Sequence, residues 1–239
     1  MNEQMFETEL IQYITTGTIT NPECLAGIPE FSAIGLGNRV VKTKLWKYEP
    51  DIKTTPQLWD NFKTILEQHN QNVLEHPMSE AEFNQVKKII SDLHTPYEAG
   101  QFLYGLNGVS QIEIDLDDGR HVFLTVFDQK EIGAGDTVYQ VVNQIERPAV
   151  INGKMNRRFD TTLLINGLPI IQIEEKRDTH DVNEALNQMH QYIDEGQYGD
   201  IFSALQILIA MTPNNVKYMA NTTSEKFNKD FAFHWQRRS

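Results

Sequence analysis

Apolar side chains recur at helical intervals along the first part of the chain. In EQMFETELIQYIT, Phe6 and Leu10 stand four residues apart, and the TGTI that follows breaks the pattern. The segments TPQLWDNFKTILEQHNQ and SEAEFNQVKKIISDLH have the same periodicity, and Ser79 and Glu82 have the spacing of a capping box at the start of the second. We therefore predict helices in these three segments and a helix-rich part over residues 1–106.

Polar and apolar positions alternate after residue 107, as expected of half-buried strands. VSQIEIDLDDGRHVFLTVFD contains two alternating runs around Asp118-Gly119, which indicates a hairpin. Further strands are predicted in DTVYQVVNQIE, RFDTTLLINGLPIIQIEEK and SALQILIAMT, and the helical pattern of DVNEALNQMHQYIDEG, ended by Gly196, precedes the last of them. This order predicts an α/β fold with a mixed sheet, in one domain whose sheet-containing core spans residues 107–221.

The strand PIIQIEEKRD ends abruptly in charged residues. Alternation places Glu174 and Lys176 on one face of the strand and Glu175 on the other. One explanation is that the chain leaves the sheet for solvent, and the other is that the strand delivers its charges to a metal. The preceding strand, RRFDTTLLING, also carries an acid, Asp160, and the Asn-Gly pair between the strands predicts a tight antiparallel turn.

The register of this hairpin decides between the two explanations. A two-residue loop would pair Asp160 with Ile173, whereas a three-residue loop or a bulge would pair it with Glu174. We predict the three-residue or bulged arrangement, in which the two carboxylates meet. Such a pair is costly unless a cation lies between its members, and hard oxygen ligands suit magnesium or manganese. With Lys176 nearby to activate water or stabilise charge on a phosphate, the pattern fits metal-dependent phosphodiester hydrolysis.

The charge of the chain is uneven. The net charge of -12 taken alone argues against nucleic-acid binding, because phosphate contacts need lysine and arginine. Residues 1–150, however, hold 22 of the 33 acids and only 11 of the 21 bases, so the remainder is almost neutral. That remainder begins with Lys154, Arg157 and Arg158 in KMNRR. A local basic rim beside a negative site is therefore feasible, although each base could equally be a solvated surface charge.

Several conspicuous residues have a structural interpretation. The single cysteine, Cys24, can form no internal disulfide and is expected to be packed. Trp46, Trp59 and Trp235 are expected to pack in the core rather than to stack on bases. The chain has no apolar run of membrane-span length and no signal peptide, so we expect a cytoplasmic protein without a membrane partner.

At this point the sequence becomes recognisable. RRFDTTLLINGLPIIQIEEKR followed by DVNEALNQMHQY resembles the endonuclease domain at the N-terminus of the R (restriction, HsdR) subunit of type I restriction-modification enzymes, in the PD-(D/E)xK nuclease superfamily. The resemblance covers about residues 138–221 and implies a PD-(D/E)xK restriction-endonuclease-like fold, with a central mixed sheet flanked by helices and an added N-terminal helical layer. In two departures from the pattern, Phe159 replaces the proline of the superfamily name and Glu175 stands where the family often has an apolar residue.

The resemblance also implies roles for the charged strand ends. Asp160 and Glu174 would ligate Mg²⁺ or Mn²⁺, with the backbone carbonyl of Glu175 as a further metal ligand. Lys176 would be the catalytic base partner. No other cofactor is implied for this part of the chain.

Two helices would contribute further residues. Gln188 and Tyr192 match the Q-x-x-x-Y element of the family and share one helical face, which implies that they position DNA or support the site. Glu7 matches the early glutamate of such nucleases and is a candidate metal ligand. The neighbouring Glu9 could be the matching residue instead, so the assignment of Glu7 stays open.

For the whole protein, the resemblance implies a type I site-specific deoxyribonuclease that cuts unmodified double-stranded DNA after ATP-driven translocation, together with specificity and methylation subunits. ATP would bind only to motor domains, whose phosphate loop this sequence lacks. We therefore expect a fragment of a longer chain, with residues 222–239 starting a linker to the motor. Two alternatives remain: a free-standing PD-(D/E)xK DNA repair nuclease, or a catalytically silent nuclease fold that serves DNA or subunit binding.

Overall fold

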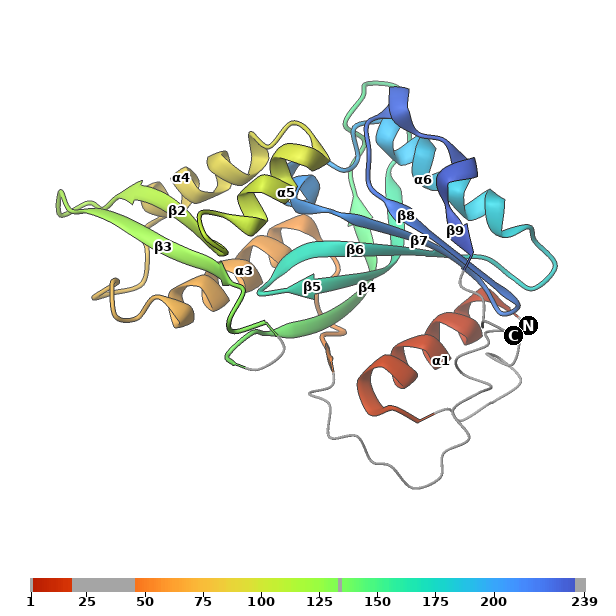
Figure 1. Ribbon diagram of the computed structural model, residues 1–239, viewed down its shortest axis with the longest axis horizontal. Helices are drawn as coiled ribbons and strands as arrows, with labels where there is room; N and C mark the ends of the chain where they lie inside the picture. The colour runs from red at the N-terminus through yellow and green to blue at the C-terminus, as the bar shows by residue number, and fades with distance from the viewer. Residues whose placement is uncertain (1, 19–45, 133–134, 235–239) are drawn as a thin grey trace.

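The computed structural model describes residues 2–18, 46–132 and 135–234, which form an α/β structure (Figure 1). The helices are α1 (Glu3–Thr16), α3 (Thr55–His69), α4 (Glu80–Ser91), α5 (Pro96–Tyr104), α6 (Val182–Asp194) and the short 3₁₀ helices η2 (Asp200–Ala204), η3 (Ser224–Lys226) and η4 (Lys229–Phe231). The strands are β1 (Lys47–Tyr48), β2 (Val109–Asp115), β3 (His121–Asp128), β4 (Tyr139–Arg147), β5 (Arg157–Ile165), β6 (Leu168–Glu175), β7 (Ile207–Thr212), β8 (Asn215–Ala220) and β9 (Phe233–His234).

The described strands form one mixed sheet of seven strands in the order β1-β4-β5-β6-β7-β8-β9. The pairs β1–β4 and β6–β7 are parallel, and the other neighbours are antiparallel. The predicted mixed sheet is thus confirmed. The predicted hairpin at Asp118-Gly119 is also confirmed, but β2 and β3 pair only with each other, in a small separate sheet beside α4 and α5 (Figure 1).

Local capping explains where the helices begin. The Ser79 hydroxyl accepts a hydrogen bond from the Glu82 backbone N–H at 3.1 Å, and the Glu82 carboxylate accepts from the Ser79 N–H at 2.7 Å, so the predicted capping box starts α4. At the C-terminal end of α1, Gly17 adopts the left-handed conformation and stops the helix, as the sequence indicates. The predicted helices α1, α3, α4 and α6 are all present.

The turn between β5 and β6 has two residues rather than three. Ile165 pairs with Leu168, and both Asn166 and Gly167 have positive φ (49° and 80°), as in the hairpin turns that Asn-Gly favours. The Asn166 side chain accepts a hydrogen bond from the backbone of Val138 and donates one to that of Val126, both at 2.9 Å. The three-residue loop is therefore wrong, because this turn is anchored on both sides as a two-residue one.

A bulge in β6 nevertheless produces the predicted register. Pro169 pairs with Leu164, but the next pair joins Ile171 to Leu163, so Ile170 is an extra residue. Beyond the bulge, Thr161 pairs with Ile173. Extending this pairing by one residue sets Asp160 opposite Glu174. The bulged version of the prediction is confirmed, and it is the bulge that brings the two acids into register.

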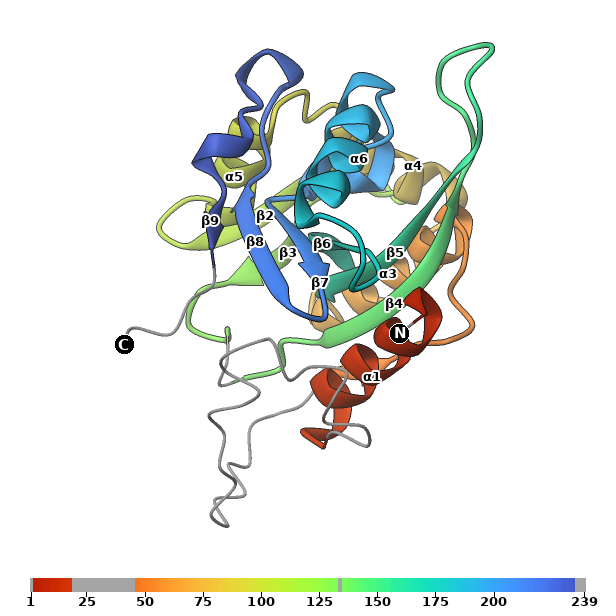
Figure 2. The ribbon, with the colours of Figure 1, turned by 90° about the vertical axis from the view of Figure 1, so that its right-hand side faces the viewer.

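Two hydrophobic cores lie on opposite faces of the main sheet. The larger is built from α3, α4, α6 and η2 against one face, and the smaller packs α1 against the other, as the two ribbon views show (Figures 1 and 2). Trp59 belongs to the larger core and Trp46 packs on the smaller, which confirms their packing roles. Cys24 and Trp235 lie outside the described residues. None of the described helices has the length and apolarity that crossing a membrane requires.

Candidate active site

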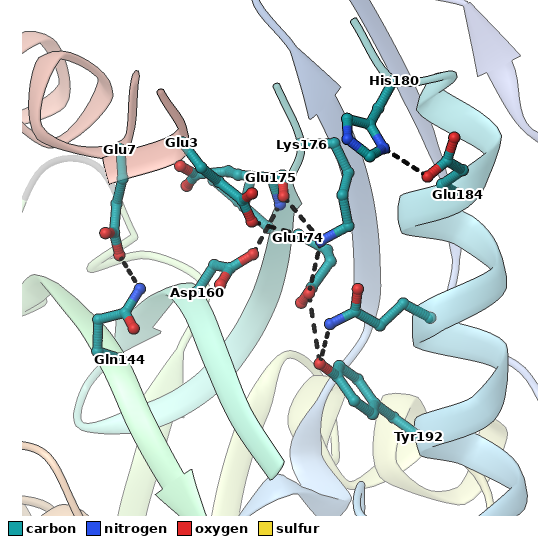
Figure 3. A network of polar contacts seen from close by, with 12 residues as sticks. Glu3, Glu7, Gln144, Asp160, Glu174, Glu175, Lys176, His180, Glu184 and Tyr192 are labelled. Atoms are coloured by element: carbon teal, nitrogen blue, oxygen red, sulfur yellow. Dashed lines mark hydrogen bonds and ion pairs between the residues drawn. The ribbon is translucent and has the colours of Figure 1, made fainter. Parts of the chain in front are cut away.

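The ends of β5 and β6 bring three acidic side chains together between α1 and α6. Asp160 Oδ2 accepts a hydrogen bond from the backbone N–H of Glu175 at 2.9 Å. Glu174 and Glu175 have no exposed surface, and they leave β6 on opposite sides, toward α6 and α1 respectively. Figure 3 shows Asp160 and Glu174 close to each other at the centre of this arrangement.

Burial changes the protonation of these acids. It raises the pKa of Asp160, against the effect of the Glu175 N–H bond. It raises the pKa of Glu174 well above its ordinary value, and the negative charge of Asp160 adds to the effect. Burial, with the charges of Asp160 and Glu7, also holds the pKa of Glu175 well above its ordinary value. The site is therefore a cluster of buried carboxyl groups whose charged forms are disfavoured by burial and by one another.

Lys176 supplies the nearest positive charge. Its Nζ donates to the backbone carbonyl of Glu175 at 2.9 Å and lies 3.5 Å from Glu174 Oε1 and 3.5 Å from Glu3 Oε1. Burial alone would lower the pKa of Lys176, but the negative charges of Glu174, Asp160 and Glu3 hold it above its ordinary value. The side chain thus bridges β6 and α1 as an ammonium group.

The helix α6 supports the other side of Glu174. The Tyr192 hydroxyl donates to Glu174 Oε1 at 3.3 Å, and the Gln188 side-chain amide donates to the Tyr192 oxygen. Tyr192 is buried and packs against Phe159, with ring centroids 5.0 Å apart. Gln188 and Tyr192 therefore form a chain that ends on Glu174, an arrangement suited to holding that carboxylate.

The helix α1 closes a cavity of about 750 Å³ on the opposite side. Asp160 and Glu175 line this cavity together with Glu3 and Glu7, which stand one helical turn apart. Glu9 does not line it. Of the two glutamates between which the sequence left the choice open, the structure brings only Glu7 to the cavity.

Amide side chains from β4 hold Glu7 in place. Glu7 Oε1 accepts hydrogen bonds from Gln144 Nε2 at 2.7 Å and from Asn143 Nδ2 at 3.1 Å. Gln144 has a φ of 56° inside the strand, a left-handed conformation that non-glycine residues rarely adopt. It stands where β4 would otherwise pair with Asp160, between the pairs Asn143–Thr161 and Ile145–Phe159.

The acids have the donor chemistry for a divalent cation. Glu174 Oε2 and both carboxylate oxygens of Glu175 are buried and make no hydrogen bond of good geometry among the described residues, although the Thr161 side chain is close enough to Glu175 to lower its pKa. A buried carboxyl group without donors is either protonated or paired with a cation, and hard oxygen ligands fit magnesium or manganese. Within residues 2–18, 46–132 and 135–234, no group of three or more Asp, Glu, His or Cys side chains is arranged as a ready metal cluster. The sequence-based prediction assigns such an ion to Asp160, Glu174 and the backbone carbonyl of Glu175.

Sequence reasoning missed some residues of the cavity. Glu3 was not singled out, although its spacing from Glu7 would have placed both on one face of α1. Lys53, whose Nζ donates to the Asn143 carbonyl at 2.8 Å, and the two amides of β4 also line the cavity. Nothing in the local sequence of these three residues indicates a site, because strand pairing and α1 packing bring them there.

Comparisons of the sequence with known proteins all indicate the same family. Residues 35–227 match the family model for the N terminus of the R protein of type I restriction enzymes. An endonuclease subunit of a type I restriction enzyme from Staphylococcus aureus (strain MSSA476) is 32% identical over 185 residues, which are 77% of this chain and 18% of that protein. The EcoprrI endonuclease subunit from Escherichia coli is 35% identical over 122 residues, 50% of this chain and 37% of that protein. The chain thus spans less than a fifth of its staphylococcal relative.

Proposed function

The chain belongs to the family of N-terminal domains of type I restriction enzyme R proteins, and from this premise we propose that it is the domain that cuts DNA, by metal-dependent hydrolysis of phosphodiester bonds. The observation that carries the proposal is the meeting of Asp160, Glu174 and Lys176 at the ends of β5 and β6. It is the acid, acid and base set expected for the PD-(D/E)xK superfamily.

In the proposed mechanism, Asp160, Glu174 and the backbone carbonyl of Glu175 would hold Mg²⁺ or Mn²⁺. The bound cation would supply Lewis-acid activation of the phosphate and of the attacking water. Tyr192, fixed by Gln188, orients the Glu174 carboxylate through its hydroxyl. These second-layer contacts maintain the position of a ligand rather than touch the substrate.

Lys176 contributes positive charge to the reaction. Because the surrounding acids keep its pKa above the ordinary value, the side chain holds its proton in the arrangement described. We assign it the stabilisation of charge that develops on the attacked phosphate and the orientation of water by hydrogen bonding. A cation held by Asp160 and Glu174 would repel the ammonium and lower this pKa, so a transient role as proton acceptor is compatible with the same position.

A basic groove next to the cavity suits the backbone of double-stranded DNA. It has a volume of about 680 Å³ and shares Arg158 and Glu146 with the acidic cavity. Arg147 and Arg157 also line it, but Arg147 is buried against Asp200 and Arg157 is paired with Glu195, so Arg158 supplies the accessible charge. Arg158 is exposed, as a residue that contacts phosphates must be. The groove would guide a duplex to the acids although the chain as a whole carries a charge of -12.

The assembly around this domain is part of the same proposal. We propose that specificity and methylation subunits select unmodified DNA, that ATP-dependent motor domains translocate it, and that residues 222–239 begin the connection to those motor domains. The family match favours this over a free-standing repair nuclease. The presence of Asp160, Glu174 and Lys176 together argues against a catalytically silent fold.

The proposal is tested by cleavage of an unmodified plasmid in Mg²⁺ and ATP by the full-length R protein reassembled with its partner subunits. Asp160→Asn should reduce cleavage by more than about 100-fold, because loss of an outer-layer partner alone typically costs 10–100-fold. Asp178→Asn removes an exposed acid just beyond β6 and serves as the matched control, with cleavage near the wild-type rate. Wild-type cleavage by Asp160→Asn would refute the proposal.

A further inference from the structure

The connection between β4 and β5 carries exposed apolar side chains. Residues 148–156, which we call the β4–β5 arm, project beyond the end of the main sheet as a long loop (Figure 2). Val150, Ile151 and Met155 expose 58%, 43% and 73% of their surface, and none of them belongs to either hydrophobic core. Single exposed apolar residues are common on protein surfaces, but three on one short projection indicate a contact surface.

The base of the arm is held in place by hydrogen bonds. The backbone N–H of Ala149 donates to the side-chain oxygen of Asn156 at 3.0 Å, which ties the two sides of the arm together. The side-chain amide of Gln197, which follows α6, donates to the carbonyl of Pro148 at 3.3 Å. The arm therefore leaves the sheet in a defined direction.

The tip of the arm is a tight turn flanked by apolar residues. The backbone N–H of Lys154 donates to the carbonyl of Ile151 at 3.1 Å, and Gly153 between them has a φ of 83°. Ile151 begins this turn, and Met155 follows it directly. The apolar side chains thus stand at the end of a narrow projection, where a partner molecule can reach them.

The charge of the arm suits a polyanion. No acid occurs between Glu146 and Asp160, although the chain contains 33 acids in all. Lys154 approaches Glu195 only to 4.0 Å and keeps 51% of its side chain exposed, and Glu195 is already paired with Arg157 at 2.6 Å. The projection is therefore basic and apolar in a chain that is otherwise strongly acidic.

The arm stands next to the residues proposed to cut DNA. It leads directly into β5, and Met155 precedes Asp160 by five residues, a length of chain that spans at most about 18 Å. Asn156 at its base lines the basic groove together with Arg158. Because successive base pairs are about 3.4 Å apart, a duplex whose phosphate lies at Asp160 would pass the tip within about five base pairs.

We propose that the β4–β5 arm enters the minor groove of the DNA beside the cut site, and that Ile151 and Met155 insert there as an apolar wedge that kinks the duplex. The inference rests on the proposed nuclease function and adds a DNA contact to the same site. Proteins that bind the minor groove combine lysine or asparagine with inserted isoleucine or methionine, and the tip offers this combination with Lys154. The kink would hold the scissile strand against the acids.

The competing explanation is that the arm docks on a partner protein. An apolar tip would suit either partner, but the absence of acids from the arm and its position beside Arg158 and the groove favour DNA. The two explanations differ in whether the apolar side chains contribute to the affinity for a bare duplex. Binding measured without divalent metal separates the inference from the nuclease proposal, because it requires no cleavage.

The experiment measures binding of the chain to a short duplex labelled at both ends, by fluorescence anisotropy and by energy transfer between the labels. The double variant Ile151→Ser/Met155→Ser should bind at least about tenfold more weakly, because it removes two apolar side chains that the groove would bury. It should also lose the change in energy transfer that reports the kink. Its slope of log affinity against log salt should match the wild type, because these side chains contact no phosphate.

Two matched variants and one altered duplex sharpen the test. Ile151→Leu/Met155→Leu keeps the apolar tip and should bind and kink DNA like the wild type. Leu106→Ser removes an exposed apolar residue that lines neither the groove nor the acidic cavity, and it should also behave like the wild type. Inosine in place of guanine removes only an amino group in the minor groove, so the wild type should bind that duplex more tightly and the double serine variant should not.

Each other outcome would overturn the inference. Wild-type affinity and energy transfer in the double serine variant would refute the wedge, and if that variant also failed to assemble with the partner subunits, the arm would be a protein-docking element. An unchanged affinity of the wild type for the inosine duplex would exclude the minor groove. Absence of duplex binding by the wild-type chain would refute the DNA contact, whereas cleavage by Asp160→Asn decides the nuclease proposal separately. Thermal unfolding should show equal stability of all variants, because the substituted side chains are exposed.

Discussion

Removal of the Tyr192 hydroxyl tests how α6 supports the site. In Tyr192→Phe, Glu174 Oε1 loses the donor at 3.3 Å, while Lys176 at 3.5 Å and the neighbouring Asp160 remain. Gln188 is partly exposed and can turn to water, so the cost falls mainly on the buried Glu174. A buried group left without its partner costs about 1–3 kcal/mol, and the length of this hydrogen bond places the expected loss near the lower end, about 1 kcal/mol. For a chain of this size, that loss corresponds to a melting temperature lower by about 2–4 °C.

Tyr198→Phe provides a matched control in the same aromatic cluster. Tyr198 packs on Phe159, as Tyr192 does, but its buried hydroxyl has no hydrogen-bond partner within the described residues. Removing that hydroxyl should therefore leave the free energy of unfolding unchanged or increase it. The assay is urea unfolding of both variants in metal-free buffer, followed by Mn²⁺ titration. Equal stability of Tyr192→Phe and the wild type, with unchanged Mn²⁺ affinity, would refute the supporting role of α6.

Three further predictions concern the frame of the site. Gly167→Ala should destabilise the chain on the order of 1–3 kcal/mol in urea unfolding, because φ is 80° and the added Cβ would lie 2.9 Å from Phe62 Cα; unchanged stability would contradict this. The hydrogen bonds from Arg157 lower the pKa of Glu195 below its ordinary value of 4.5. The free energy of unfolding that these bonds contribute should therefore be fully present above pH 4.5 and lost as the pH falls through the lowered pKa. Glu195→Gln should flatten this acid limb in unfolding measured from pH 7 to pH 3, and an unaltered limb would count against the pair. Arg158→Gln should reduce the slope of log affinity for duplex DNA against log salt by about 0.9, the value for one phosphate contact, whereas an identical slope would remove Arg158 from the DNA path.

The parts of the fold that local sequence determines could be predicted. The capping box at Ser79 and the Asn-Gly turn act through neighbouring residues, so α4 and the β5–β6 hairpin were recognisable from sequence. The Thr95–Glu98 capping box gave an equally local signal for α5 that went unused. In contrast, β1 and β9 contain two residues each and exist only because distant strands accept them, so no local pattern reveals them.

The candidate site shows the same division. Spacing and resemblance proposed Asp160, Glu174 and Lys176 as site residues, and the structure brings the three together. The register of β5 and β6 depends on a bulge, which the sequence offered as an alternative without showing its position. The left-handed conformation of Gln144 could not be predicted, because it depends on how β4 meets β5 and on the position of Glu7. Alternation already placed Glu174 and Glu175 on opposite faces of β6, but which helix covers each face became clear only once α1 and α6 were placed.

The measurement that tests the central claim most directly is plasmid cleavage by the reassembled enzyme carrying Lys176→Ala, with ATP hydrolysis followed in the same reaction. We predict that cleavage is lost while ATP hydrolysis continues at the wild-type rate, because Lys176 lies with Asp160 and Glu174 in the proposed cutting site, whereas the ATP-dependent motor is proposed to reside in other domains. Cleavage at the wild-type rate would contradict the account and would mean that the charged end of β6 is not where the DNA is cut.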